Sequence, residues 1–399
     1  MISFQAAWIC PIDQPPIRNG VVSVDAGKIV SVGTSASRDG IRDLGSVAIL
    51  PGLINAHTHL ELSWMRERVP PASKFTDWVK SLFAVRGRPD GTMSAEQVAA
   101  IASAIDEAKA SGTVAAGDIS NSLTSAWPMR DAGLDGVIFH ELLGFKARDG
   151  ALVDATREMR NTAAATGARV SLAPHAPYST SLELFSAIRN AVTASDCPIM
   201  SVHLGESPEE VELLERGSGP WRSMLETIGM WREDWQPPGC DPVAYLDRHG
   251  LIDERTLVVH GVQFTDGALE TLARRGATLV TCPRSNQWVG VGYPPIERFY
   301  RSGVKVAVGT DSLASVEDLN VFSELRTMRY LAPGVPAAKI LESATLSGAT
   351  ALGLEDDLGS LSAGKRAQMI AVRLPGQVTD IEEFLLTGIS PEQIEPLNP

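Results

Sequence analysis

Apolar runs alternate with longer stretches of mixed polarity through most of this 399-residue chain. Eight short runs rich in apolar and β-branched residues predict strands, and intervening stretches such as 95–111 and 182–194 carry apolar residues at helical spacing. Alternating strands and helices predict a parallel sheet, and eight such units predict a closed (β/α)8 TIM barrel of the α/β class. The strands are expected at 48–56, 113–119, 136–142, 169–174, 198–204, 256–262, 278–282 and 304–310.

The two ends of the chain follow a different pattern. Short apolar pieces separated by Gly and Asp near the N-terminus predict small antiparallel strands, and 359–372 has the same texture. No obvious further strand follows that segment. Inside the barrel, 221–238 contains three tryptophans and a Pro-Pro pair, which predicts an irregular excursion after the fifth strand. We expect a barrel and a small β-sandwich domain built from both termini, with boundaries 1–50, 51–351 and 352–399.

Composition and charge narrow the function classes. Lys and Arg total 35 and Asp and Glu total 48, so the net charge of −13 opposes binding to a nucleic-acid backbone. The four cysteines are widely spaced, which favours neither a disulfide framework nor a zinc knuckle. No apolar run is long enough to span a bilayer, and the N-terminus does not resemble a signal peptide. We expect a cytoplasmic enzyme with a small-molecule substrate, and we leave a homodimer open.

Five polar residues stand where predicted strands end. His57 and His59 follow the first strand at positions i and i+2, so both imidazoles face the same side of extended backbone. His203, His260 and Asp311 end the fifth, sixth and eighth strands. Strand ends converge at one opening of a barrel. Three imidazoles and a carboxylate suit Zn²⁺, and also Fe²⁺ or Mn²⁺. The sequence therefore predicts one divalent metal, zinc favoured, bound by His57, His59, His203 and Asp311.

Glu206 lies three residues beyond the histidine of the fifth strand, where the chain leaves the strand. A divalent metal lowers the pKa of water from about 15.7 to about 7, and the released proton needs an acceptor. Glu206 is placed to shuttle that proton. The alternative is a solvated loop glutamate like its neighbours Glu209 and Glu210. We expect His260 to stabilise developing negative charge, and Asp311 both to bind metal and to accept a hydrogen bond from the water.

The segments PGLINAHTHLE, SVHLGES, VVHG, VTCPRSN and VGTDS resemble the deaminase branch of the amidohydrolase superfamily over nearly the whole chain. Within that branch, FTDWVKSL, APHAPYST, GSGPW, CPRSNQWVGVG and TDSLASVEDLNVFSEL are most similar to the aminodeoxyfutalosine deaminases of the futalosine route to menaquinone. Deaminases of S-adenosylhomocysteine and methylthioadenosine, and chlorohydrolases, are relatives. The resemblance implies a barrel with a β-sandwich made from both termini, and it agrees with the metal-binding and catalytic roles inferred above.

The chain departs from that pattern at two places. Dinuclear members carry a carboxylated lysine at the end of strand four, where this chain has Pro-His-Ala-Pro at 174–177. We therefore expect one metal. Relatives usually have Asp at the position of Gln368, a difference that concerns the edge of the small domain and not the chemistry.

Substrate contacts are expected from residues near the same strand ends. His175 resembles the residue that contacts the sugar in adenosine-type relatives, and Glu141 lies on the third strand. Trp78 could stack on a base, with packing in a wall as the alternative. Arginines and an amide following strands three and seven could also reach the pocket. These candidates are Arg148, Arg284 and Asn286.

The resemblance predicts hydrolytic deamination of an aminopurine nucleoside, namely 6-amino-6-deoxyfutalosine to futalosine and ammonia. Its carboxyphenyl-ketone arm needs an apolar wall and a cation or donor for the carboxylate. Phe75, Trp64 and Trp221 are candidates for the wall, and Arg148 or Arg284 for the cation. Alternatives are deamination of S-adenosylhomocysteine, methylthioadenosine or another adenosine, or hydrolysis of a cyclic amide, a guanidine or a chlorotriazine. A silent barrel kept as a binding module is a further alternative.

Overall fold

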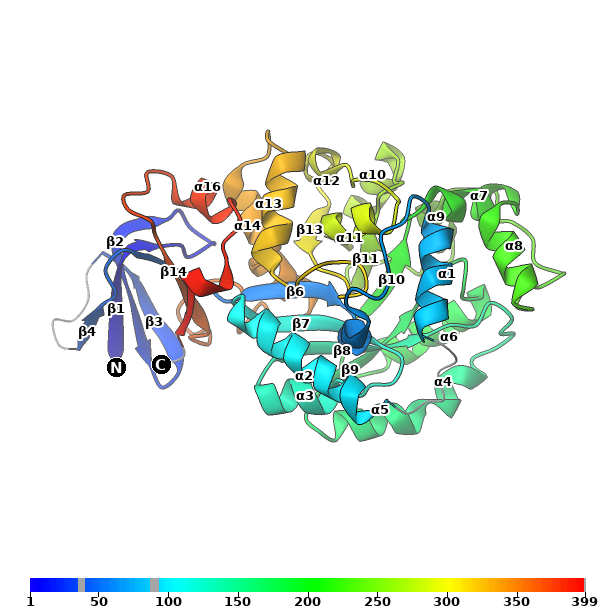
Figure 1. Ribbon diagram of the computed structural model, residues 1–399, viewed down its shortest axis with the longest axis horizontal. Coiled ribbons are helices and arrows are strands. Elements are labelled where there is room, and N and C mark those ends of the chain that lie inside the picture. Colours follow the sequence, from blue (N-terminus) through cyan, green and yellow to red (C-terminus); the bar gives the residue numbers. More distant parts are fainter. Residues whose placement is uncertain (35–39, 87–92, 398–399) are drawn as a thin grey trace.

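The computed structural model describes residues 1–34, 40–86 and 93–397. The parallel strands form two four-stranded sheets of order β6-β7-β8-β9 and β10-β11-β12-β13. They occupy the middle of the molecule, and helices cover their outer sides (Figure 1). Their bounds are β6 Leu53–Thr58, β7 Thr113–Ser120, β8 Asp135–Leu142, β9 Arg169–Pro174, β10 Met200–Leu204, β11 Thr256–His260, β12 Thr278–Thr281 and β13 Lys305–Val308.

Hydrogen bonds join the edge strands of the two sheets. The amide of His203 in β10 donates to the carbonyl oxygen of His175, just after β9, at 2.9 Å. At the other pair of edges, the amide of Asp311, which follows β13, donates to the carbonyl oxygen of His57 in β6 at 3.0 Å. Polar residues from both sheets are therefore held side by side at the strand ends.

The first predicted strand, 48–56, is wrong as a single element. It is two strands, β5 Val47–Pro51 and β6, which belong to different sheets. Gly52 separates them, and a Cβ there would lie 2.2 Å from a side-chain carbon of Val114. The break occurs because the chain passes too close to β7 at this point for any side chain.

Strands from both ends of the chain meet in a seven-stranded sheet of order β15-β14-β5-β1-β2-β3, with β4 paired to β1. Both termini lie at this end of the molecule (Figure 1). The sequence showed no strand after 372, yet β15 pairs antiparallel with β14. The two layers of a β-sandwich stay a prediction, as do the domain boundaries. The remaining strands are β1 Ile2–Ile9, β2 Ile17–Asp25, β3 Lys28–Gly33, β4 Ile41–Asp43, β14 Met369–Arg373 and β15 Ile394–Leu397.

Most helices connect successive parallel strands. The segment 221–238, predicted to be irregular, begins inside helix α8 (Pro220–Thr227), where Trp221 and Leu225 bury one face. No helix among the described residues is both long and apolar enough to cross a bilayer. The others are η1 Leu60–Met65, α1 Phe75–Arg86, α2 Ala95–Ala110, α3 Ala126–Ala132, α4 Ala151–Ala155, α5 Arg157–Ala164, α6 Leu182–Thr193, α7 Pro208–Arg216, α9 Pro242–Arg248, α10 Asp266–Arg275, α11 Pro283–Trp288, α12 Ile296–Ser302, α13 Val321–Leu331, α14 Ala337–Ser343, α15 Leu346–Ala351, α16 Ile381–Leu385 and η2 Pro391–Gln393.

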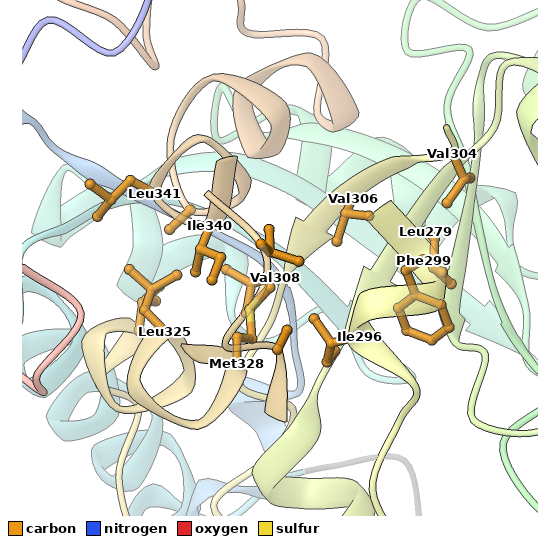
Figure 2. Packing of buried hydrophobic residues seen from close by; sticks show 14 of the residues in the cluster. Leu279, Ile296, Phe299, Val304, Val306, Val308, Leu325, Met328, Ile340 and Leu341 are labelled. Atoms are coloured by element: carbon orange, nitrogen blue, oxygen red, sulfur yellow. The ribbon is translucent and has the colours of Figure 1, made fainter. Parts of the chain in front are cut away.

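The parallel strands are apolar on both faces because both faces are covered. In β13, Val306 and Val308 pack outward against helices α12, α13 and α14 (Figure 2), whereas Ala307 joins the inner cluster with Val259 and Val280. Packing on two sides fixes the register of each strand, since a shift by one residue would turn the outward-facing side chains inward and the inward-facing ones outward. The strand ends are therefore rigid positions for functional side chains.

Candidate active site

The four predicted metal-binding residues come together at the strand ends. Ligand atoms of His57, His59 and Asp311 lie within 4.8 Å of one another, with the Oδ1 atom of Asp311 3.5 Å from Nε2 of His59 and 3.9 Å from Nε2 of His57. The ring centroids of His57 and His203 are 5.0 Å apart. His57, His203 and His260 form a second such group. The arrangement offers several ligands to one ion.

The chemistry of these donors fits a divalent metal. His57 is fully buried, and neither of its ring nitrogens has a hydrogen-bond partner within the described residues. Unpaired buried polar atoms of this kind are rare unless something else binds them. Burial, followed by the neighbouring imidazoles of His203 and His59, lowers the pKa of His57 well below its usual value. Burial also lowers the pKa of His59 to about 3. Both imidazoles are therefore neutral, which is the form that binds a metal.

Hydrogen bonds orient two members of the site. Nδ1 of His203 lies 3.0 Å from the carbonyl oxygen of His175 and donates to it, which leaves Nε2 with a free lone pair. The hydroxyl of Ser285 donates to Oδ2 of Asp311 at 2.6 Å, so Oδ1 faces the histidines. These hydrogen bonds orient the two side chains and leave Nε2 of His203 and Oδ1 of Asp311 available for a metal.

Two residues of the site have left-handed backbone conformations. The φ angle is 78° at His260 and 63° at Asp311, and neither is glycine. Such a conformation costs on the order of 1–3 kcal/mol, and it persists only where the surroundings enforce it. Both residues lie where the chain leaves a strand, His260 at the end of β11 and Asp311 just after β13.

Glu206 is only 4% exposed, and its Oε1 atom lies 3.6 Å from Nε2 of His260. Burial raises the pKa of Glu206 well above its usual value, and the charges of Asp311 and Glu210 add to this effect. The protonated form of this carboxyl group is thus favoured, next to the His260 imidazole, whose pKa burial lowers well below its usual value. A carboxyl group with a raised pKa is better suited to donate a proton than a solvated loop glutamate.

Asn286 does not contact the cavity, contrary to the prediction that it binds substrate. It is fully buried behind His260, with its amide nitrogen 3.0 Å from Nδ1 of that imidazole. With the amide as donor, the imidazole proton resides on Nε2, on the side of Glu206. Asn286 belongs to helix α11, which begins at Pro283, just after β12 ends at Thr281.

A cavity of about 240 Å³ adjoins the histidine cluster. Trp78, His175 and Glu141, all predicted to bind substrate, line it. Nδ1 of His175 lies 2.6 Å from Oγ of Ser179. Oε2 of Glu141 accepts from the side chain of Asn121 at 3.1 Å, while its Oε1 atom lies 3.6 Å from Nδ1 of His203. One wall of the cavity is therefore polar and continuous with the metal-binding group.

The opposite wall and the mouth are apolar. Phe75 and Trp221, both expected in the wall, line the cavity, and Tyr178 stacks on Trp221 at a centroid distance of 4.0 Å. Trp64 does not line it and packs beside Arg68 instead. Several large apolar side chains of the mouth are strongly exposed. These are Phe83, 47% exposed, Leu143, 44%, Ile228, 56%, and Met230, 37%.

Neither predicted arginine lines the cavity. Arg148 is exposed and forms an ion pair with Asp234, with NH2 2.7 Å from Oδ1. Arg284 is engaged 2.8 Å from Oδ1 of Asp318 and 3.1 Å from Oε2 of Glu317. Acidic residues distant in sequence hold both guanidinium groups outside the cavity lining.

Arg86, which sequence reasoning missed, is the one arginine or lysine among the described residues that line the cavity. It ends helix α1 and donates to Asn121 Oδ1 at 2.8 Å and to Glu61 Oε1 at 3.2 Å. The signal was present in the sequence. Arg86 stands four residues after Leu82 and seven after Val79, both cavity residues, so all three share a helix face.

A buried group of imidazoles with a carboxylate, next to a buried glutamate with a raised pKa and a cavity, is typical of a metal-binding hydrolase. The chain belongs to the amidohydrolase family, whose sequence profile matches residues 48–392.

Two sequence relatives and one solved structure are similar to this chain. The chain is 30% identical over 382 residues to a 5-methylthioadenosine/S-adenosylhomocysteine deaminase of Moorella thermoacetica, covering 91% of this chain and 83% of that protein. It is 31% identical to an aminodeoxyfutalosine deaminase of Deinococcus radiodurans, over 76% of this chain and 73% of that protein. A zinc-bound crystal structure of an adenosine deaminase from Xanthomonas campestris superposes with a TM-score of 0.82 at 27% identity, covering 98% and 90% of the two chains.

Proposed function

We propose that this protein is a deaminase that hydrolyses the exocyclic amino group of an aminopurine nucleoside and releases ammonia. The observation that carries the proposal is the buried carboxyl group of Glu206, 3.6 Å from Nε2 of His260 and beside the metal-binding group. Deamination of this kind needs a proton donor at the ring nitrogen next to the attacked carbon. The two sequence relatives described above are both named as deaminases of adenosine-type compounds.

The roles of the residues follow from their positions. His57, His59, His203 and Asp311 would hold one divalent ion, with zinc favoured, and when bound the ion supplies a water activated at neutral pH. Glu206 takes up a proton of the attacking water and donates it to the purine ring nitrogen, then takes up the second proton of that water and delivers it to the departing amine. His260, with its proton on Nε2, donates a hydrogen bond to the oxygen on which negative charge develops. The net reaction replaces the amino group and one water with a carbonyl group and ammonia.

As part of this proposal, we infer that the two four-stranded sheets close into a single (β/α)8 barrel. The support is the hydrogen bonding between His57 and Asp311 at one pair of edges, and between His175 and His203 at the other. Closure would explain why residues from both sheets share one cavity.

We further propose 6-amino-6-deoxyfutalosine as the substrate. Its aryl ketone arm suits the apolar mouth formed by Phe83, Leu143, Ile228 and Met230, since burying such side chains against a ligand is favourable. Its carboxylate requires a cation, and Arg86 now takes the role first given to Arg148 or Arg284. Methylthioadenosine is the alternative that the same apolar mouth would also accept.

The test is a substrate panel with purified, metal-loaded protein. The compounds are 6-amino-6-deoxyfutalosine, methylthioadenosine, S-adenosylhomocysteine and adenosine, and ammonia release and the shift in purine absorbance are both followed. We expect 6-amino-6-deoxyfutalosine to exceed adenosine in kcat/KM by at least about 10²-fold, because remote binding energy contributes to the transition state. A preference for S-adenosylhomocysteine would overturn the substrate but leave the deaminase. No ammonia from any of the four would overturn the deaminase itself.

A further inference from the structure

Glu210, in the first turn of helix α7, is fully buried. The sequence suggested a solvated loop glutamate at this position, and that interpretation is wrong. A buried carboxylate is unfavourable unless its oxygens are satisfied by hydrogen bonds or charges. Its surroundings therefore need an explanation.

The two carboxylate oxygens of Glu210 each accept one hydrogen bond from consecutive backbone amides. Oε1 accepts from the amide of Gly205 at 3.0 Å, and Oε2 accepts from the amide of Glu206 at 3.1 Å. Glu210 thus clamps the backbone of the residue whose side chain is the proposed proton donor. Two hydrogen bonds donated to one carboxylate fix both the position and the orientation of that peptide segment.

This clamp is separate from the ordinary cap of the helix. Ser207 is the N-cap of α7, and its hydroxyl already accepts from the amide of Glu210 at 3.3 Å. The side chain of Glu210 reaches back beyond the N-cap to amides outside the helix. Helix capping alone therefore does not account for its placement.

The other side of the same turn is also fixed. The carbonyl oxygen of Gly205 accepts from the amide of Gln263 at 2.8 Å, and a Cβ on Gly205, whose φ is 62°, would lie 2.2 Å from the ring of Phe264. The turn is thus pressed against the loop that follows β11, the strand that ends at His260. Glu210 completes the restraint from the side of the amides.

We propose that Glu210 is a positioning residue for catalysis, which acts by holding the Gly205–Glu206 turn so that the carboxyl group of Glu206 stays beside His260. The inference rests on the proposed function, since its effect on the rate passes through Glu206. The main-chain clamp itself is independent of which nucleoside is the substrate.

The experiment is a double-mutant cycle of Glu206→Gln and Glu210→Gln in the metal-loaded full chain. Glutamine at 210 keeps one acceptor oxygen but places an amide donor against a backbone amide, so the turn loosens. A displacement of about 1 Å costs about 10²-fold in rate. We expect Glu210→Gln to lower kcat by about that factor with KM little changed and metal content unaffected. In the Glu206→Gln background it should cause no further loss. Glu215→Gln, an exposed change of equal charge on the same helix, is the control.

A second measurement does not depend on turnover. Amide hydrogen exchange at Gly205 and Glu206 should be faster in Glu210→Gln and unchanged in Glu215→Gln. Losses that multiply in the double variant, or normal exchange at these amides, would overturn the positioning role. If Glu210→Gln does not fold, Glu210→Asp, which is one methylene too short to reach both amides, enters the same cycle. If the wild-type protein is inactive on every nucleoside, the proposed function is refuted. The exchange measurement would still show whether Glu210 holds the Gly205–Glu206 turn.

Discussion

The floor and the mouth of the cavity are built differently. The floor consists of residues at strand ends, such as His57 and Asp311, which are buried and held by the backbone of both sheets. The mouth consists of exposed apolar side chains from helices and loops, such as Phe83 and Ile228. A rigid floor fixes the chemistry, while a mouth on inserted segments can vary the substrate without disturbing it. The following predictions test this division.

Removing a ligand from the floor has the largest expected effect. His203→Ala should reduce the metal content from about one ion per chain to near zero, because it removes one of the three imidazole nitrogens that suit zinc and replaces it with a methyl group that cannot bind metal. Deaminase activity should fall to background. Elemental analysis and ammonia release measure the two effects. His249→Ala, which removes an exposed histidine, should retain both metal and activity. About two ions per wild-type chain would contradict the single site.

Changing the proton donor comes next. Glu206→Gln should keep the metal and lower kcat by about 10²- to 10⁴-fold. Burial raises the pKa of Glu206, and only the protonated form can donate, so wild-type kcat should fall as the pH rises through that pKa. The variant should lose this alkaline limb. A glutamine variant with a near-normal rate would remove Glu206 from the mechanism.

Arg86 tests whether the polar wall contributes to selectivity. Arg86→Gln should lower kcat/KM for 6-amino-6-deoxyfutalosine by about 10- to 100-fold, since a charged hydrogen bond contributes about 1.5–3 kcal/mol. Methylthioadenosine, which has no carboxylate, should be affected much less. Arg148→Gln is the matched control and should change neither value. Equal losses on both substrates would mean that Arg86 only supports Glu61 and Asn121.

The mouth has the smallest expected effect. Ile228→Asp should raise the KM for 6-amino-6-deoxyfutalosine by about 10-fold, because part of an apolar contact is replaced by a solvated charge. The kcat/KM for adenosine should stay within about twofold. Tyr330→Asp, which changes an exposed aromatic residue outside the cavity lining, controls for altered surface charge. An equal effect on adenosine would show that floor and mouth are not separable.

The sequence predicted which residues meet at the floor because the signals for their positions are local, while their roles stay predictions. The i, i+2 spacing of His57 and His59 and the position of His203 at a strand end determine where these side chains point. The residues of the mouth were harder to predict from the sequence, because the partners of a long side chain depend on tertiary packing. Arg148 and Arg284 were expected at the pocket, but they pair with Asp234 and Asp318 and do not line the cavity.

The same limit applies to the fold. The parallel strands were predictable from their continuous apolar runs, which reflect burial on both faces. The break at Gly52 depends on a close approach to Val114, which lies in another element. The pairing of Ile394–Leu397 with β14 is likewise a long-range contact, and the short mixed segment itself gave no strand signal.

The left-handed backbone at His260 and Asp311 has a consequence for protein engineering. Glycine adopts this conformation without the strain that a side chain brings. A glycine substitution at either position would therefore relieve strain and remove a catalytic group at the same time. A library selected only for heat resistance would thus gain backbone stability by discarding function. Selection for a thermostable variant must therefore score turnover in every round, and consensus or glycine substitutions should spare both positions.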